Sequence, residues 1–160
     1  MINYIIKNLT DVKMGIIAHG VNCQGVMGSG VAKDLREKYP KIFNSYKERC
    51  NFVDRKQSAS LLGMVDYVMV SKDPTIYIAN CFTQNFYGRN PGRKFADPEA
   101  ITSCLENILY TNGHGYNYPI YIPKIGCGLG GLDWETEVKP NIEWLANSYP
   151  DQTINLCDLG

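Results

Sequence analysis

The sequence predicts a three-layer α/β fold with a largely parallel sheet, because strand-like and helix-like segments alternate along it. Short apolar runs bounded by polar or turn residues are typical of strands, and they occur at residues 2–6, 15–21, 63–70, 75–81, 119–125 and 153–159. Apolar residues at spacings of three and four are typical of amphipathic helices, and they occur at residues 29–39, 41–50, 98–110 and 134–147. Such alternation predicts helices packed on a largely parallel sheet.

The length and composition predict a single domain over residues 1–160. A chain of 160 residues buries most of its apolar surface around one core, and 44% hydrophobic with 20% charged residues is typical of globular proteins. Asp97 and Asp133 are expected to cap the two helices that follow them. Residues 52–62 lack periodicity and are expected to form a loop. Residues 84–96 are expected to form a second long loop, and such loops are often functional.

The charge pattern argues against several partners. Sixteen basic residues balance sixteen acidic ones, so the chain has no strong nucleic-acid footprint. No apolar run reaches the roughly 18 residues of a membrane span, and the N-terminus lacks the order of a signal peptide. We therefore expect a cytoplasmic protein without membrane association. We also expect it to be a monomer.

The six cysteines are scattered, without a C-x-x-C pair, and only two histidines accompany them. A metal site is not expected from this pattern, nor is another cofactor. We expect free thiols, with Cys81, Cys104 and Cys157 as small buried core residues.

The first glycine-rich segment is Gly25-Val26-Met27-Gly28-Ser29-Gly30-Val31-Ala32, which follows an expected strand and opens the next helix. Glycine lets backbone N–H groups approach a phosphate closely, and a helix N-terminus favours negative charge. The segment therefore suits a phosphate or diphosphate. Its spacing matches neither the Walker nor the dinucleotide pattern, and a plain turn is the alternative.

The second segment, Ile125-Gly126-Cys127-Gly128-Leu129-Gly130-Gly131, also lies between an expected strand and an expected helix. In open α/β sheets, ligands bind outside the carboxyl ends of the strands, and both segments leave from such ends. Two anion-binding loops on one edge predict a single ligand with a diphosphate or several oxyanions, the alternative being two unrelated turns.

The run His19-Gly20-Val21-Asn22-Cys23-Gln24 before the first glycine segment, together with both segments and Leu132-Asp133-Trp134, resembles the macrodomain family. The resemblance covers nearly the whole chain. Within the family it is to the branch of ADP-ribose 1″-phosphate phosphatases, terminal-ADP-ribose glycohydrolases and DNA-ADP-ribosyl glycohydrolase antitoxins. It implies an α/β/α fold with a mixed, largely parallel six-stranded sheet, and ADP-ribose or ADP-ribose 1″-phosphate as ligand, with an ADP-ribosylated macromolecule as a further partner.

The resemblance also implies roles for particular residues. Asn8 and Leu9 stand where the family reads adenine, and Asn22 stands where a polar side chain meets the distal ribose. Phe86 and Tyr87 are candidates to pack on a ring, with burial of Phe86 in the core as the alternative. The expected ligand-binding residues are Asn8, Leu9, Asn22, Gly25, Met27, Gly28, Ser29, Gly30, Val31, Gln84, Phe86, Tyr87, Ile125, Gly126, Cys127, Gly128, Leu129 and Gly130.

The chain departs from the family pattern at three places. Lys7 stands where a glycine is usual. The lysine-using glycohydrolases carry their lysine just after the fourth strand, where this chain has Thr83-Gln84-Asn85, and the accompanying acid falls opposite Gly130. Neither Asn nor Gln forms a Schiff base, so these departures favour phosphatase chemistry.

The candidate catalytic residues are His19, Asn22, Asn80 and Asp133. Histidine suits proton transfer near neutral pH, although a core histidine is the alternative for His19. Asp133 could orient water, with helix capping as the alternative, and Asn80 could donate to a phosphate or ribose.

Three functions remain open from the sequence. The first is hydrolysis of ADP-ribose 1″-phosphate, the second is removal of ADP-ribose from protein or nucleic acid, and the third is binding of ADP-ribose without catalysis. A nucleic-acid substrate would gain from clustered cations near the site, and Arg89, Arg93 and Lys94 form such a cluster, with a solvated loop as the alternative.

Overall fold

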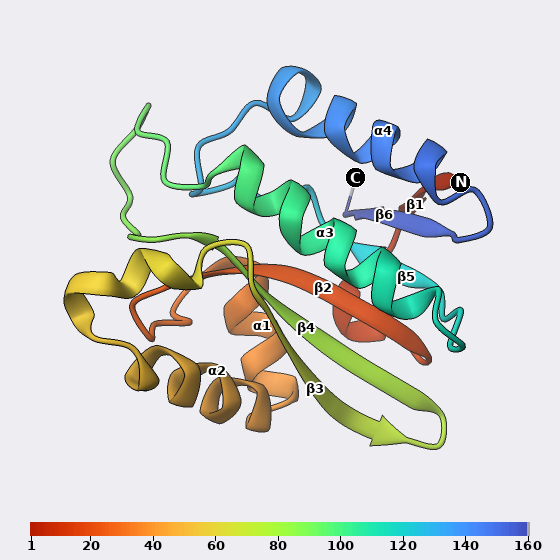
Figure 1. The fold of residues 1–160 in the computed structure, drawn as a ribbon, viewed down its shortest axis with the longest axis horizontal. Helices are drawn as coiled ribbons and strands as arrows, with labels where there is room; N and C mark the ends of the chain where they lie inside the picture. The colour runs from red at the N-terminus through yellow and green to blue at the C-terminus, as the bar shows by residue number, and fades with distance from the viewer. Residues whose placement is uncertain (160) are drawn as a thin grey trace.

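The computed structural model describes residues 1–159, which form one mixed sheet (Figure 1). Its strands are β1 (Ile2–Ile6), β2 (Gly15–Asn22), β3 (Val65–Lys72), β4 (Thr75–Gln84), β5 (Ile120–Ile122) and β6 (Ile154–Asp158). The strand order is β1-β6-β5-β2-β4-β3. Strand β3 is antiparallel to β4, and the other neighbours are parallel. The predicted mixed, largely parallel six-stranded sheet is confirmed.

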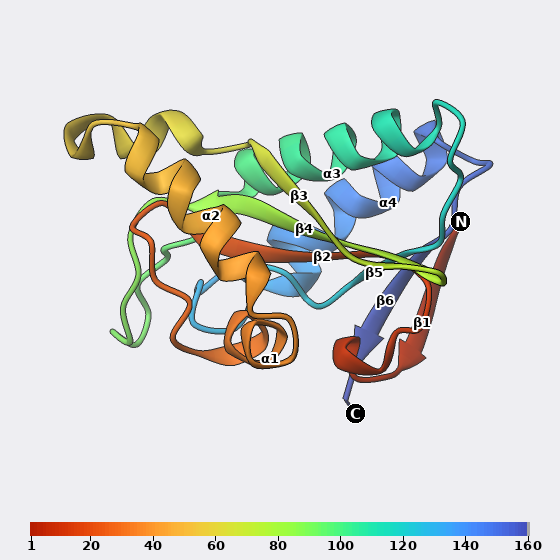
Figure 2. The same ribbon diagram turned by 90° about the horizontal axis from the view of Figure 1, so that it is seen from below.

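Helices cover both faces of the sheet. They are α1 (Gly30–Lys38), α2 (Lys41–Phe52), α3 (Pro98–Asn112) and α4 (Lys139–Ser148). Figure 2 shows α3 and α4 on one side of the sheet and α1 on the other. Two apolar cores result. Ile16 and Ala18 of β2 pack in the core that contains residues of α3 and α4, whereas Ile17 and Val21 pack in the core that contains residues of α1 and α2. This is the alternation expected of a strand buried on both faces.

The structure differs from the sequence prediction in two segments. Residues 52–62, expected as a loop, contain the short 3₁₀ helix η2 (Arg55–Leu61), which Asp54 caps by accepting from the backbone N–H of Lys56. A short 3₁₀ helix has three residues per turn and therefore lacks the 3.6-residue apolar pattern by which an α-helix is predicted. The last predicted helix divides into a π-helical turn, η3 (Trp134–Val138), and α4, which has a proline in its first turn.

Several local predictions are confirmed. Asp97 accepts from the backbone N–H of Glu99 and caps α3, and Asp133 accepts from the backbone N–H of Thr136 and caps η3. Cys81, Cys104 and Cys157 are buried, and all six cysteines, which lie within the described residues, are unpaired.

Residues 1–159 contain neither a candidate membrane span nor a candidate metal site. None of their helices combines the length and apolar character that crossing a membrane requires. No group of three or more His, Cys, Asp or Glu side chains in that range could hold a metal ion.

The chain changes direction across the sheet between β2 and β5. These strands are parallel neighbours, with Ile16 paired to Ile120. The chain leaves β2 toward α1, on one face, and leaves β5 toward η3 and α4, on the other. Adjacent strands whose connections diverge in this way leave a crevice at their carboxyl ends, where open α/β sheets bind ligands.

Candidate functional site

A cleft of about 920 Å³ lies at the carboxyl ends of β2, β4 and β5. Its size falls within the roughly 300–1,000 Å³ typical of sites for small ligands. The predicted residues that line it are Asn22, Met27, Gly28, Ser29, Gly30, Val31, Gln84, Tyr87, Ile125, Gly126, Cys127, Gly128, Leu129 and Gly130. Both glycine-rich loops therefore face one cavity, as the sequence predicted.

The lining also contains residues that sequence reasoning missed. These are Gly20, Val21, Val26, Ala32, Thr83, Gly88, Arg89, Pro123, Lys124, Cys157, Asp158 and Leu159. Most of them are neighbours in sequence of predicted residues and lie near the carboxyl ends of the same strands. The last three carried no local signal, because they reach the cleft through the pairing of β6 with β5.

Asn22, the last residue of β2, shapes the first glycine loop. Its Oδ1 accepts from the backbone N–H of Gln24 at 2.9 Å, and its Nδ2 donates to the carbonyl of Val26 at 2.8 Å. The side chain lines the cleft, but both of its polar atoms are engaged by the loop that it supports. This geometry makes Asn22 a positioning residue for the loop.

Tyr46 of α2 anchors the same loop from behind. Its hydroxyl donates to Oδ1 of Asn22 at 2.7 Å and accepts from the backbone N–H groups of Gly25 and Val26, both at 3.0 Å. Burial raises the pKa of the Tyr46 phenol well above its ordinary value, so the hydroxyl keeps the proton that it donates. Gly25 thus belongs to the support of the loop and does not line the cleft, contrary to prediction.

The end of β4 is tied to the first loop through Asn85. Its side-chain oxygen accepts from Nε2 of Gln24 at 3.0 Å and from the Ser58 hydroxyl at 2.7 Å, and its carbonyl accepts from the backbone N–H of Cys23. Gln84 lines the cleft and donates from Nε2 to the carbonyl of Phe86 at 2.9 Å. The position of the family lysine therefore carries an amide that is already bonded locally.

The second loop is a close-packed turn. Gly126 has a φ of +80°, which favours glycine, and a Cβ on Gly130 would lie 2.6 Å from the carbonyl oxygen of Gly126. The Gly130 carbonyl accepts from the backbone N–H groups of Phe95 and Ala96, so the long loop 84–96 packs against this turn. No side chain of any kind fits at position 130 in this conformation, which explains the absence of the family acid there.

Both loops present unpaired backbone donors. Across residues 1–159, the N–H groups of Gly28, Ser29, Gly128 and Leu129 donate to no protein acceptor. The Ser29 hydroxyl also makes no capping bond to α1. Free N–H groups at a turn and at a helix N-terminus form anion-binding sites, so the cleft has a donor set on each side.

The structure places His19 and Asn80, two of the predicted catalytic residues, away from the cleft. Both side chains are buried in the core and neither lines the cleft. Nε2 of His19 lies 2.6 Å from Oδ1 of Asn80, and Nδ2 of Asn80 donates to the carbonyl of Ile42 and to Asp66. Burial lowers the pKa of His19 to about 4, with the Asn80 contact opposing the change, so the ring stays neutral near pH 7.

Four other predicted residues also lie outside the cleft lining. The Asp133 carboxylate caps η3 by accepting from the backbone and hydroxyl of Thr136, and these bonds lower its pKa. The Asn8 side chain caps the short helix η1 (Leu9–Asp11), and Leu9 is buried in the core. Phe86 is 55% exposed, so its alternative prediction as a core residue is also wrong.

The titratable groups that line the cleft are few. Burial raises the pKa of the Cys127 thiol to about 11, so it is not a thiolate at neutral pH.

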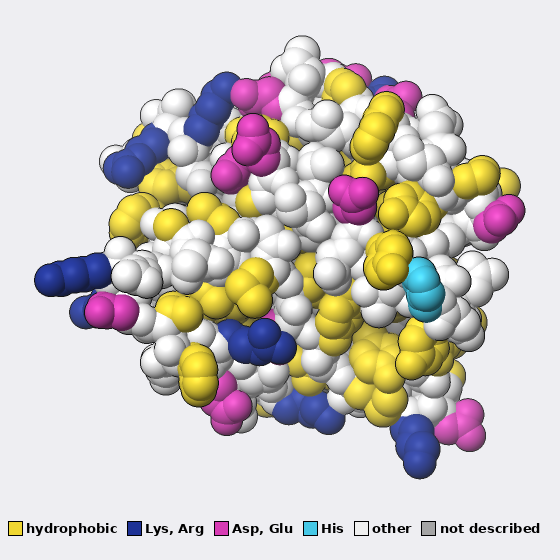
Figure 3. Space-filling model, viewed as in Figure 1, with side chains coloured by type: hydrophobic (Ala, Val, Ile, Leu, Met, Phe, Trp, Pro, Cys, Tyr) yellow, Lys and Arg dark blue, Asp and Glu magenta, His cyan; other side chains and the backbone are white. Residues whose placement is uncertain are grey.

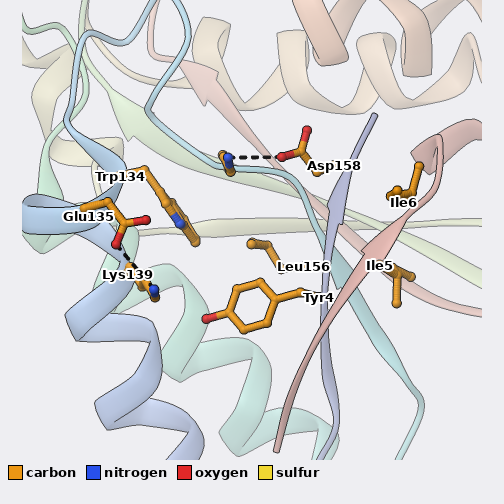
Figure 4. Close-up of a pocket in the computed structure, with 9 residues that line it drawn as sticks. Tyr4, Ile5, Ile6, Trp134, Glu135, Lys139, Leu156 and Asp158 are labelled. Carbon is orange, nitrogen blue, oxygen red and sulfur yellow. Dashed lines mark hydrogen bonds and ion pairs between the residues drawn. The ribbon is translucent and has the colours of Figure 1, made fainter. Parts of the chain in front are cut away.

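A second cavity of about 380 Å³ adjoins the cleft. Lys124 Nζ lies 3.0 Å from Oδ2 of Asp158, and this ion pair lines both cavities. Figure 4 shows Asp158, Tyr4 and Trp134 around that cavity, with an ion pair between Glu135 and Lys139 at its edge.

Comparison with known proteins assigns the family. The family model described as Macro domain matches residues 18–139, which contain both glycine loops. The chain belongs to the macro domain family. This macrodomain is 30% identical to an ADP-ribose 1″-phosphate phosphatase of Saccharomyces cerevisiae, in an alignment that covers 85% of this chain and 89% of the yeast protein.

Two mycobacterial comparisons extend the match. The macrodomain is 28% identical to the DNA ADP-ribosyl glycohydrolase of Mycobacterium tuberculosis over 94% of its length, although it spans only 40% of that longer protein. Among solved structures, the macrodomain of Mycobacterium tuberculosis DarG has a TM-score of 0.80 and 26% identity, covering 98% of this chain and 97% of that one. Both support the fold described above over nearly the whole chain.

Proposed function

We propose that the cleft binds ADP-ribose across its two glycine loops and that this macrodomain hydrolyses ADP-ribose 1″-phosphate. The observation that carries the proposal is the pair of unpaired N–H sets, around Gly28 and Gly128, which face one cavity at the turning point of the sheet. The diphosphate offers oxyanions to both sets, and the terminal phosphate of ADP-ribose 1″-phosphate offers further oxyanions at the same edge. The yeast relative named as this phosphatase aligns over most of its own length, which supports the same choice.

The mechanism that fits this cleft depends on electrostatics. Water attacks phosphorus, the bond from phosphorus to the ribose 1″ oxygen breaks, and the products are ADP-ribose and inorganic phosphate. The water proton passes by way of an oxygen of the substrate phosphate to the departing ribose 1″ oxygen, which leaves as a hydroxyl. Phosphoryl transfer requires mainly positioning and stabilisation of charge on the phosphoryl oxygens, which backbone N–H groups can supply. His19 and Asp133 take no part in this scheme.

Removal of ADP-ribose from DNA or protein is the second candidate. Arg89 lines the cleft and lies in the exposed loop that also carries Arg93 and Lys94. The mycobacterial glycohydrolase aligns over nearly the whole of this chain. Because Gln84 occupies the lysine position, this reaction would use water directly at the ribose carbon.

A comparison of three substrates tests the proposal. The protein is incubated with ADP-ribose 1″-phosphate, ADP-ribosylated DNA and ADP-ribosylated protein, and released phosphate and ADP-ribose are measured. Phosphate release from the first substrate alone is expected. Release of ADP-ribose from DNA or protein without phosphate release favours the second candidate, and binding without any turnover contradicts both and indicates a non-catalytic reader.

Binding itself is tested by calorimetry in the presence of a chelator. We expect one ADP-ribose per chain and no requirement for metal, because the proposed contacts are backbone N–H groups. Absence of heat at high micromolar protein, or binding that only a divalent cation restores, contradicts the site. We further propose that the protein acts as a monomer in the cytoplasm, and its six unpaired cysteines support a reducing compartment.

A further inference from the structure

A small aromatic pocket of about 140 Å³ lies at the end of the sheet opposite the cleft. Ile16, near the start of β2, lines this pocket, whereas Asn22, at the end of the same strand, lines the cleft. Four tyrosines contribute to its wall: Tyr67, Tyr77, Tyr116 and Tyr118. The proposed ADP-ribose reaction uses none of them.

Two of the tyrosines come from the β3–β4 hairpin. Tyr67 pairs in register with Ala79, and Met69 pairs with Tyr77, so Tyr67 and Tyr77 lie on the same face of the sheet. That face packs against the core beneath α3. Figure 1 shows the turn of the hairpin at the same end of the molecule as the C-terminal end of α3. Tyr67 and Tyr77 are partly buried against this core.

The other two tyrosines come from the turn after α3. Asn112, the last residue of α3, holds this turn by donating to the Tyr118 carbonyl and accepting from the Tyr118 N–H, both at 2.9 Å. The Tyr77 and Tyr118 rings are 6.2 Å apart and tilted by 49°, and the Tyr116 and Tyr118 rings are 5.8 Å apart. Figure 3 shows hydrophobic side chains gathered on the surface beside a histidine.

The chemistry of the wall favours a cation. Aromatic faces carry negative electrostatic potential, and tilted rings can turn two such faces toward one group. No charged side chain lines the pocket. Lysine and arginine groups cover five other aromatic rings, Tyr4, Tyr39, Phe43, Phe95 and Tyr121, but within residues 1–159 none covers a ring of this pocket. The described residues thus supply no cation to these four rings, of which Tyr116 and Tyr118 stack on each other with their planes 20° apart.

The size of the pocket restricts what can enter. A dry cavity of about 150 Å³ holds one benzene molecule, and nucleotide-sized ligands need roughly 300 Å³ or more. A trimethylammonium group is compact, and aromatic cages bind such groups through their ring faces. We propose that this pocket, here called the tyrosine pocket, binds a quaternary ammonium group, with Tyr67, Tyr77, Tyr116 and Tyr118 as its aromatic wall.

The test compares choline with its neutral isostere, 3,3-dimethylbutan-1-ol, on the native protein. Tyrosine ring signals are followed by NMR during titration. We expect saturable shifts with choline and an affinity for the neutral alcohol that is lower by about tenfold, because several ring faces contribute. Equal affinities would show that the pocket takes an apolar group, and the absence of saturable shifts with choline would also overturn the proposal.

A second arm identifies the source of the group. A short peptide that carries trimethyllysine is titrated beside the same peptide with unmodified lysine. Tighter binding of the methylated peptide than of choline identifies a modified protein as the source, and the reverse order identifies a small molecule. Equal affinity of the two peptides contradicts recognition of a quaternary ammonium group.

Variants at Tyr116 test whether choline binds in the tyrosine pocket. Tyr116 is 59% exposed, so its replacement has little structural consequence. Tyr116→Leu should weaken choline binding by about two- to fivefold, the size of one exposed cation–ring contact, and Tyr116→Phe should retain it. Tyr110→Leu is the matched control, because Tyr110 is 61% exposed and lies outside the pocket. The affinity for ADP-ribose should stay unchanged in all three variants, which separates this proposal from that for the cleft.

Discussion

The hydroxyl of Tyr46 donates a 2.7 Å hydrogen bond to Oδ1 of Asn22, joining helix α2 to the end of strand β2 at the mouth of the cleft. The same hydroxyl accepts from the backbone N–H groups of Gly25 and Val26. One buried phenol that does not line the cleft therefore helps to fix the conformation of the first glycine loop, together with the side chain of Asn22.

Tyr46→Phe removes this anchor and keeps the ring. We expect a loss of stability of about 1–3 kcal/mol, because two N–H groups and one side-chain oxygen lose a partner. We expect ADP-ribose affinity to fall by about tenfold, equivalent to about 1.4 kcal/mol, since the loop N–H groups lose their fixed direction. Chemical unfolding and calorimetry measure the two effects. Tyr149→Phe is the control, because the Tyr149 hydroxyl has no hydrogen bond within residues 1–159, and it should change neither.

Asn22→Ala should weaken binding and turnover, through the loop rather than through a lost ligand contact. Its effect on affinity should therefore not add to that of Tyr46→Phe, because both variants remove parts of one hydrogen-bond network. A double-mutant cycle on ADP-ribose affinity measures the coupling. Full additivity would indicate that Asn22 contacts the ligand independently of Tyr46.

Gly128→Val and Gly130→Ala should separate ligand binding from folding. A Cβ on Gly128 meets no atom within 4 Å, whereas a Cβ on Gly130 would lie 2.6 Å from a backbone oxygen. Gly128→Val should thus abolish ADP-ribose binding with little change in melting temperature, because its side chain enters the diphosphate path. Gly130→Ala should lower the melting temperature as well. Retained affinity in Gly128→Val would contradict binding of the ligand by the second loop.

Gln84→Lys places an amine where the lysine-using relatives carry theirs. Among residues 1–159, Asp158 supplies the carboxylate in the cleft lining, and it already pairs with Lys124. Without a carboxylate partner to accept its proton, the new amine should stay protonated and form no Schiff base. We expect no borohydride-trapped adduct with ADP-ribose, and phosphate release should continue. A trapped adduct would show that the lysine alone restores that chemistry.

The burial of His19 predicts that stability depends on pH. Its pKa falls from 6.5 to about 4 on folding, so the unfolded chain binds a proton in this interval that the folded protein does not. The contribution of His19 to the free energy of unfolding is therefore fully present near pH 7. It is lost as the pH falls from 6.5 toward 4, which lowers the free energy of unfolding by about 3 kcal/mol. Urea unfolding at several pH values measures the slope.

Two variants test whether His19 causes this dependence of stability on pH. His19→Gln should flatten it by about one proton, whereas His114→Gln should not, because His114 is exposed. His19→Ala, which would cost about 10²- to 10⁴-fold in rate if the imidazole transferred a proton, should instead act on stability. A rate loss of that size in a folded His19→Ala protein would return the histidine to the mechanism.

The sequence alone determined the architecture and the two loops. Apolar runs predicted all six strands, and the runs of the central strands β2 and β4 are continuous because both faces of these strands are buried. The glycines around positions 28 and 128 were recognisable because close backbone approach requires residues without a side chain. That both loops face one cleft followed from their common position at the carboxyl ends of strands.

Only the tertiary structure decided what individual polar side chains do. His19 and Asn22 lie on the same strand, three residues apart, yet His19 is buried against Asn80 and Asn22 lines the cleft. No local pattern in the sequence indicated that Tyr46 or Cys157 belongs to the site. Tyr46 contacts the first loop from helix α2, which packs on the sheet, and Cys157 lines the cleft because its strand pairs with β5. Direction and hydrogen-bond partners depend on contacts between residues distant in the chain, and a linear pattern of residue types does not contain them.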